Sequence, residues 1–248
     1  MKLSLRSINL NFGSRQILRE LNFTFQTGIT VLTGDNGSGK TSLLNIIAGQ
    51  LKEYSGKITV DDCLPDLTRI AYCRQFMADA FFTATIEKEI RYTLAYSSST
   101  RTENDIWNNL NGLGLSHADY ANRSPFYINQ SEQKLFSLAL SLIKEFDILL
   151  LDETDSGLPF TGKKKLADFL KTISDKIIIV ISHDLWFINQ LNPPVLKLDK
   201  GGSFKYYSQA ADFFQSLTTD PVTLNILISK DKLLQKLAQQ TKSESLSC

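Results

Sequence analysis

The pattern of apolar and polar residues predicts that the chain begins with two β-strands. In two stretches, apolar residues alternate with polar neighbours, which is the period of a strand with one buried face. The alternating residues are Leu3, Leu5, Ile8 and Leu10 in the first stretch and Leu21, Phe23 and Phe25 in the second. The first stretch changes phase between Leu5 and Ile8, and residues 11–14 supply a turn.

Strands and helices alternate over most of the remaining chain. Strands are predicted at residues 28–33, 57–60, 69–73, 147–151 and 176–181. Helices are predicted around residues 43–51, 164–172, 185–191 and 224–237, and in several pieces over 85–144. This order predicts an α/β fold with an N-terminal antiparallel β subdomain, a parallel sheet and an inserted helical segment.

Composition narrows the range of functions. The 248 residues carry a net charge of +1, with 42% hydrophobic and 21% charged residues. This balance disfavours disorder and disfavours nucleic-acid binding through bulk charge. The apolar runs are far shorter than the ~20 residues of a membrane-crossing helix, so direct membrane insertion is not expected. The three cysteines match no metal-site spacing and indicate a reducing, cytosolic compartment.

A glycine-rich loop follows the predicted strand at 28–33. It fits the pattern G-x-x-x-x-G-K-[ST] at every fixed position. Its residues are Gly34, Asp35, Asn36, Gly37, Ser38, Gly39, Lys40 and Thr41, with Ser42 next in the following helix. Backbone amides of such a loop surround phosphate oxygens, and the helix dipole adds positive potential. We expect Lys40 to reach the β- and γ-phosphates and Thr41 to ligate magnesium.

Two acids end the buried strand at 147–151. Asp152 and Glu153 would lie at the carboxyl edge of the sheet, where open α/β sheets bind ligands. There Asp152 would hold magnesium and Glu153 would polarise an attacking water. The alternative is that the two acids only solvate the end of the strand.

A histidine follows the next buried strand, at 176–181. His183 would lie at the same sheet edge and could contact the γ-phosphate and orient the water. The alternative is a solvent-exposed or helix-capping histidine, and Ser182 could cap the next helix in either case. The other histidine, His117, is in a polar turn and receives no functional assignment.

The order of these motifs resembles the ATP-binding cassette (ABC) ATPases over about residues 2–210. The resemblance implies a P-loop NTPase cassette with a RecA-like core, and ATP and Mg²⁺ as cofactors. It also implies that Phe12 stacks on adenine, although Phe12 could instead belong to the hairpin core. Gln75 matches the glutamine that links magnesium and the attacking water to the helical subdomain. Residues 155–158 match the family's D-loop, although Pro159 stands where Asp is usual.

One family motif is altered. The family's Leu-Ser-Gly-Gly-Gln or Leu-Ser-Gly-Gly-Glu aligns with Ile128 followed by Asn129, Gln130, Ser131 and Glu132. In the family this motif crosses a head-to-tail dimer to the partner's γ-phosphate, and its glycines permit close backbone approach. Gln130 adds a side chain there, and Asn129 replaces the donor Ser. The alternative is that Asn129 and Ser131 only cap a helix.

The resemblance implies the ATPase subunit of an ABC transporter, acting through separate transmembrane subunits at the cytoplasmic side of the cell membrane. The altered motif suggests a heterodimer with a second ABC ATPase whose signature is intact. Residues 79–90 resemble energy-coupling-factor ATPases. The expected domains are 1–220, with a helical subdomain at about 76–145, and a C-terminal helix and tail at 221–248. A regulatory module with little turnover and a soluble non-transport ABC ATPase remain as alternatives.

Overall fold

The computed structural model describes residues 1–74, 81–97 and 99–218. Gln75 and the C-terminal stretch at 221–248 lie outside these residues, so their assignments stay predictions. Within the described ranges, no helix has the length and apolar character needed to cross a bilayer.

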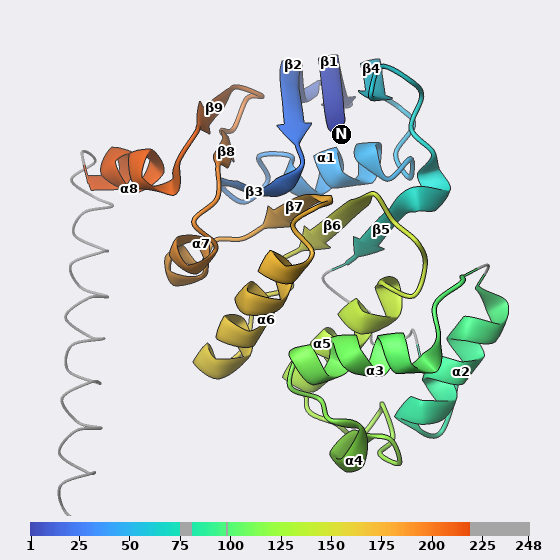
Figure 1. Ribbon diagram of the computed structural model, residues 1–248. Coiled ribbons are helices and arrows are strands. Elements are labelled where there is room, and N and C mark those ends of the chain that lie inside the picture. Colours follow the sequence, from blue (N-terminus) through green and yellow to red (C-terminus); the bar gives the residue numbers. More distant parts are fainter. Residues whose placement is uncertain (75–80, 98, 219–248) are drawn as a thin grey trace, which may run out of the picture.

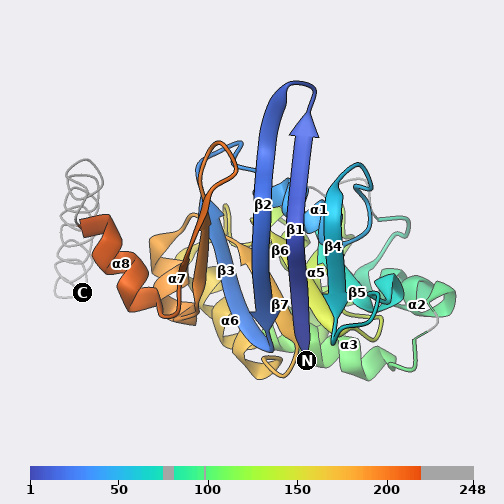
Figure 2. The same cartoon turned by 90° about the horizontal axis from the view of Figure 1, so that it is seen from above.

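The predicted hairpin forms two strands of an antiparallel sheet, and the tip of the hairpin projects from the rest of the molecule (Figure 2). Its strands are β1 (Lys2–Phe12), β2 (Arg15–Gln26) and β4 (Ser55–Val60), in the order β2-β1-β4. The change of phase in the sequence is a real irregularity. The β1–β2 register shifts between Leu5 and Ile8, and Ser7 there has a left-handed φ of 48°. The shift returns Ile8 to the buried face, where it is fully covered.

The second sheet has six strands in the order β5-β6-β7-β3-β8-β9. The strands are β3 (Gly28–Gly34), β5 (Ile70–Cys73), β6 (Ile148–Asp152), β7 (Ile177–Ile181), β8 (Val195–Leu198) and β9 (Phe204–Tyr207). All neighbouring pairs are parallel except β8–β9. The sequence pattern did not predict β8 and β9.

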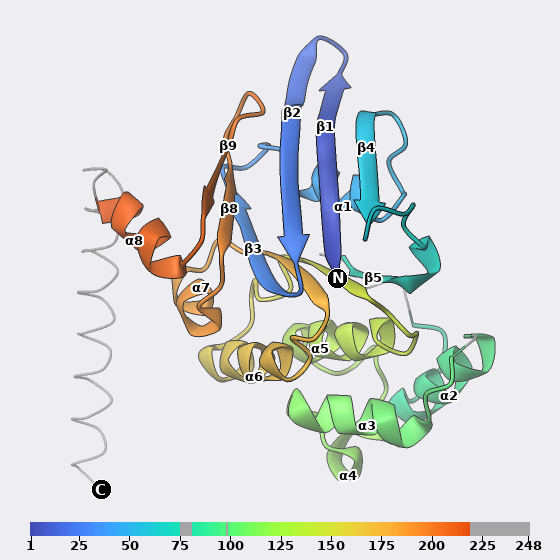
Figure 3. The ribbon, with the colours of Figure 1, turned by 45° about the horizontal axis from the view of Figure 1, so that its top comes forward.

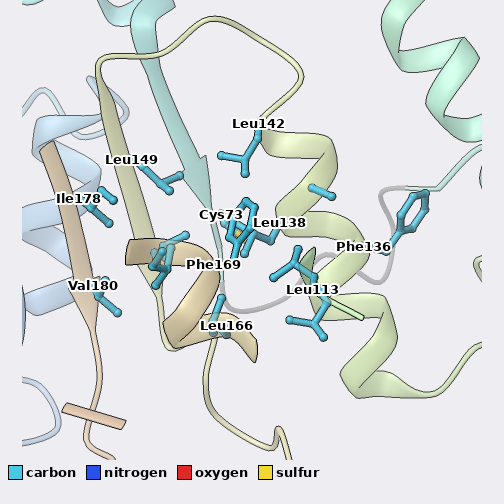
Figure 4. Packing of buried hydrophobic residues seen from close by; sticks show 14 of the residues in the cluster. Cys73, Leu113, Phe136, Leu138, Leu142, Leu149, Leu166, Phe169, Ile178 and Val180 are labelled. Carbon is cyan, nitrogen blue, oxygen red and sulfur yellow. The ribbon is translucent and has the colours of Figure 1, made fainter. Parts of the chain in front are cut away.

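This sheet separates two hydrophobic cores, which explains its uninterrupted apolar strands. Alternate residues of β6 serve opposite faces. Ile148 and Leu150 pack with the antiparallel sheet and α1 (Lys40–Ile47), while Leu149 and Leu151 pack with the helices on the other face. Figure 4 shows this second core between the strands and two helices, with labelled residues including Leu149, Ile178, Leu138 and Phe169.

The remaining helical segments flank the two sheets or form the inserted helical segment. They are η1 (Leu67–Arg69), α2 (Ile86–Tyr96), α3 (Glu103–Gly112), α4 (His117–Tyr120), α5 (Gln130–Ser141), α6 (Phe160–Thr172), α7 (Leu185–Leu191) and α8 (Ala210–Thr218). Helices α2, α3 and α4 lie together on the side of the molecule opposite the antiparallel sheet (Figures 1 and 3). Helix α6 begins at Phe160, earlier than predicted, because Pro159 is preorganised to precede the first turn. The predicted α/β class, with its antiparallel sheet and mainly parallel core, is confirmed.

Candidate functional site

The strand order brings three loops to one edge of the parallel sheet. Strand β7 lies between β6 and β3, and all three run in the same direction. Their carboxyl ends therefore carry, side by side, the glycine loop after β3, the acids after β6 and the histidine after β7. This is the edge where open α/β sheets bind ligands.

Two glycines in the loop have conformations and neighbours that exclude other residues. Gly34 has φ of +133°, and a Cβ there would lie 1.9 Å from the carbonyl oxygen of Leu198 in β8. Gly39 has φ of +96°, and its Cβ would lie 2.7 Å from Cγ2 of Ile17. The loop is therefore packed tightly on β8 and on the hairpin, and only glycine fits both positions.

Polar groups of the loop point to an anion site. Gly39 is the N-cap of α1 and has no side chain to bond the first-turn amides, which are free to bind phosphate oxygens. The Ser38 hydroxyl is buried and has no hydrogen-bond partner in the part of the chain that the structure describes. The Lys40 ammonium lies inside the loop, 2.9 Å from the oxygen of Gly34 and 2.8 Å from that of Asp35.

Asp152 lies beside Thr41, as expected for a shared metal site. The carboxyl is 4% exposed, and burial raises its pKa, while a hydrogen bond from the Thr41 side chain opposes that shift. Tyr72 from β5 also donates to Asp152, with Oη to Oδ2 at 3.5 Å. Sequence reasoning missed Tyr72, because the contact depends on β5 lying next to β6.

Glu153 and His183 face each other at the ends of adjacent strands. His183 Nε2 lies 3.8 Å from Glu153 Oε1. Glu153 has a left-handed φ of 50°, which is uncommon for a residue with a side chain, and its amide donates to Ile181 O at 3.2 Å. Backbone strain of this kind concentrates at functional sites.

The charges at this edge act on one another. Burial lowers the pKa of Lys40, and the nearby carboxylates, chiefly Glu153 and Asp152, oppose that shift. Burial also lowers the pKa of His183, and the Lys40 charge adds to the effect. His183 is therefore neutral near pH 7 and has a ring nitrogen able to accept a proton.

The tip of the β1–β2 hairpin forms one wall of the cavity beside the phosphate loop. Phe12 is 52% exposed, so it is not a core residue of the hairpin. It lines a cavity of about 450 Å³ together with Thr41, Tyr72 and Asp152. Arg15 pairs with Phe12 across the hairpin and donates from Nη2 to Gly37 O at 3.3 Å. Sequence reasoning missed Arg15, because 22 positions separate it from the loop that it contacts.

The altered signature segment forms the start of α5. Asn129 is its N-cap and forms a capping box with Glu132, so the predicted capping role is present. Gln130 is exposed. Ser131 Oγ donates to Gly157 O at 3.2 Å, and Lys134 Nζ contacts Ser156 O. The segment is thus bound to the loop that follows Glu153.

The described residues fit Mg²⁺ and a nucleoside triphosphate. Magnesium takes few protein ligands and accepts phosphate oxygens for the rest. A carboxylate at Asp152 beside the Thr41 hydroxyl supplies such a set. The unpartnered Ser38 hydroxyl and the Gly39 cradle suit the phosphates. Gln75, expected near the metal, is outside the described residues.

This fold and loop define a phosphate-loop protein that binds nucleoside triphosphates. Comparison with known proteins identifies the branch. The ABC transporter family profile matches residues 18–156, which is more than half of the 248 residues. The chain therefore belongs to the ABC transporter family.

Several relatives show how far the similarity extends. An energy-coupling factor transporter ATP-binding protein of Thermotoga maritima is 29% identical over 201 residues, which cover 77% of this chain and 76% of that protein. One of Clostridium tetani is 27% identical over 204 residues, covering 75% and 70%. Another relative from Clostridium tetani is 29% identical over 196 residues, or 75% of this chain and 44% of its own length.

A solved structure shares the fold. A bacterial Atm1-family ABC exporter with ATP bound superposes with a TM-score of 0.74 at 18% identity, over 92% of this chain and 42% of the exporter chain. At this identity the similarity concerns the fold alone.

Proposed function

We propose that this chain is the ATP-hydrolysing subunit of an ABC transporter, coupling Mg-ATP hydrolysis to solute transport through separate membrane subunits. The observation that carries the proposal is the convergence of Lys40, Glu153 and His183 at one sheet edge, with 3.8 Å between the last two. The subunit would lie at the cytoplasmic side of the cell membrane, held there by its partners.

Each residue has a role that follows from its chemistry. Lys40 and the first-turn amides of α1 offset the negative charge of the β- and γ-phosphates. Glu153 accepts a proton from the attacking water, and His183 orients that water and contacts the γ-phosphate. Phe12 stacks on the adenine ring. Thr41 and Asp152, with Gln75, hold Mg²⁺, which supplies Lewis-acid stabilisation of the phosphate charge when bound.

The start of α5 supports an asymmetric pair of subunits. The hydroxyl of Ser131 is bound to Gly157 O of its own chain, and Gln130 occupies a position where glycine lets backbone approach phosphate. A partner with an intact signature would complete the site on this chain's phosphate loop. The opposite site would turn over slowly.

An aromatic groove supports contact with a membrane subunit. A cavity of about 420 Å³ lies between β5 and the helical segment, and it is lined in part by Phe82, Tyr92 and Tyr96. Phe82 is 72% and Tyr96 79% exposed, which is unusual for large apolar rings on a protein surface. Glu89 fixes the wall of the groove by accepting hydrogen bonds from Phe82 N and Thr83 N. An apolar helix of a membrane subunit suits this groove.

The energy-coupling-factor branch is the best supported within the family. Thr85 caps α2, and Glu87 and Glu89 occupy its first turn, as the sequence predicted. This segment is part of the stretch that resembles the energy-coupling-factor ATPases, and two of the relatives carry that description.

Glu153→Gln tests the proposed hydrolysis directly. The variant should bind ATP as the wild type does and lose most of its ATPase activity, by about a hundredfold or more. Glu53→Gln, at an exposed glutamate outside the helices and strands, is the control. An unchanged ATPase rate in a folded Glu153→Gln variant would reject Glu153 as the base.

Co-purification from the native host tests the asymmetric assembly. The expected result is a complex holding this chain, a second cassette ATPase and a membrane protein. A symmetric homodimer with two equally active sites would reject the heterodimer. ATP binding without turnover, with and without the partner, would favour the regulatory alternative.

A further inference from the structure

Two polar side chains are buried together next to the edge of the parallel sheet that carries Glu153 and His183. Asp155 is 2% exposed and Ser182 is 0% exposed. Ser182 Oγ donates a hydrogen bond to Asp155 Oδ2 at 2.7 Å. Leaving buried polar atoms unbonded costs free energy, so this bond, which satisfies Asp155 Oδ2, favours a defined relationship between the two backbone segments. Asp155 Oδ1 has no hydrogen-bond partner in the described part of the chain.

The two segments that this bond joins carry the proposed catalytic groups. Asp155 is two residues after Glu153, in the loop that leaves β6, and Ser182 immediately precedes His183 at the end of β7. A backbone bond from Glu153 N to Ile181 O, at 3.2 Å, also joins the two segments. The Asp155–Ser182 bond is therefore well placed to fix the His183 ring relative to the Glu153 carboxylate.

We infer that Asp155 and Ser182 form a positioning pair that sets the geometry between Glu153 and His183. Neither side chain touches substrate in this role, and each acts through its neighbour. The inference rests on the proposed function only where it predicts that loss of this pair slows turnover. Its effect on His183 itself is a property of the folded chain.

Other contacts fix the same two loops from outside. Ser182 Oγ accepts from Asp184 N at 3.1 Å, and Asp184 caps α7 by accepting from Phe187 N at 2.8 Å. The Lys163 ammonium of α6 contacts Asp184 Oδ2. Ser182 is thus the point where the histidine loop, the cap of α7 and Asp155 meet.

The charged groups that act on Asp155 are Asp184, at the start of α7, and Lys163, on α6. Burial raises the pKa of Asp155 to about 6, and the bond from Ser182 opposes the shift. Because a carboxylate and a carboxylic acid both offer an acceptor oxygen, the bond from Ser182 survives protonation of Asp155.

The experiment uses the histidine ring as its own reporter. The chain has two histidines, His183 and His117, so NMR titration of their ring protons gives two curves, assigned with His117→Gln. In Ser182→Ala and in Asp155→Ala, looser packing should admit water, and the lowered pKa of His183 should rise toward about 6.5. His117, which packs on Trp107 at 4.5 Å between ring centroids, should not change.

Conservative variants separate the hydrogen bond from charge and from packing. Ser182→Thr keeps the donor and Asp155→Asn keeps an acceptor, so both should retain a titration of His183 close to that of the wild type. Ser4→Ala is the matched control, because it removes another buried hydroxyl, which accepts from Thr24 at 3.3 Å in the distant antiparallel sheet.

Turnover gives an independent measurement. Both alanine variants should lower kcat about ten- to a hundredfold, with KM for Mg-ATP within about twofold, since binding groups are untouched. The double variant should be no worse than the poorer single variant. If the wild type proves to have no ATPase activity, the proposed function fails, while the His183 titration still decides the positioning pair.

The inference is overturned if His183 titrates as in the wild type in whichever alanine variant folds. It is overturned equally if Asp155→Asn disturbs His183 as much as Asp155→Ala does, because charge rather than the bond would then be responsible.

Discussion

The Nε2 atom of His183 lies 3.8 Å from Oε1 of Glu153, across the ends of two neighbouring parallel strands. At this separation, which is slightly longer than a hydrogen bond, both side chains can contact a third group that lies beside them. A water and a terminal phosphate would be that third group in the proposed reaction. The order of the strands brings the two residues together, although they are far apart along the chain.

Acid pH should reduce activity through His183. Because burial and the Lys40 charge lower its pKa, the neutral ring persists below the ordinary value of about 6.5. The ATPase rate should therefore stay level to a lower pH than an exposed histidine would permit, and then fall as the ring gains a proton. A pH–rate profile checks this, and His183→Gln should remove that acid limb. An acid limb at or above pH 6.5 that survives in His183→Gln would contradict the assignment.

The glycine loop should tolerate no added methyl group at Gly39. Gly39→Ala combines a left-handed φ of +96° with a Cβ 2.7 Å from Ile17 Cγ2. Gly201→Ala is a close match, since Gly201 has φ of +94° and open space around it. Urea unfolding should show a loss of about 1 kcal/mol for Gly201→Ala and a clearly larger loss for Gly39→Ala. ATP binding should fail only in the latter. Equal losses would mean that packing on Ile17 is unimportant.

Arg15 should contribute to nucleotide affinity. Its guanidinium reaches Gly37 of the phosphate loop, and a charge-assisted bond to phosphate is worth about 1.5–3 kcal/mol. Arg15→Ala should therefore weaken Mg-ATP binding by about tenfold or more and leave adenosine binding nearly unchanged. Arg19→Ala, an exposed arginine on the same strand, is the control. Calorimetric titration of both ligands measures the difference, and an equal loss for adenosine would rule out a phosphate contact.

Asp155 should make stability fall as pH rises. Its folded pKa of about 6 exceeds the ordinary 3.8, so the folded state binds more protons than the unfolded state between these values. The free energy of unfolding should therefore decline across this window by about 3 kcal/mol relative to Asp155→Asn. Above about pH 6 the difference should be constant. Urea unfolding at several pH values tests it, with Asp168→Asn as an exposed control. A variant with the same pH slope as the wild type would contradict the shift.

Features that depend on neighbouring residues in the sequence were predictable. The apolar pattern changes phase between Leu5 and Ile8, and the strand register shifts at the same place. The apolar runs before Asp152 and His183 predicted strands buried on both faces, and every residue of β6 and β7 is buried. Parallel strands then required the two loops to share one edge of the sheet.

Features that depend on distant pairing were not predictable. Asp155 and Ser182 are 27 positions apart, and neither residue type is distinctive in its own segment. Tyr72 reads as an ordinary strand residue until β5 is placed beside β6, where its hydroxyl meets Asp152. Periodicity shows which face of a strand is buried, but it does not show which strand lies alongside.

The close approach of Gly34 to Leu198 means that the conformation of the nucleotide loop depends on strand β8. Strand β8 contains no motif, yet its carbonyl oxygen would lie 1.9 Å from any Cβ at the first position of the loop. A chain cut before Val195 would keep the glycines, Lys40, both acids and His183, and would lose the surface against which the loop is formed. Integrity of the motifs is therefore a poor guide to whether a fragment of this chain can hold a triphosphate.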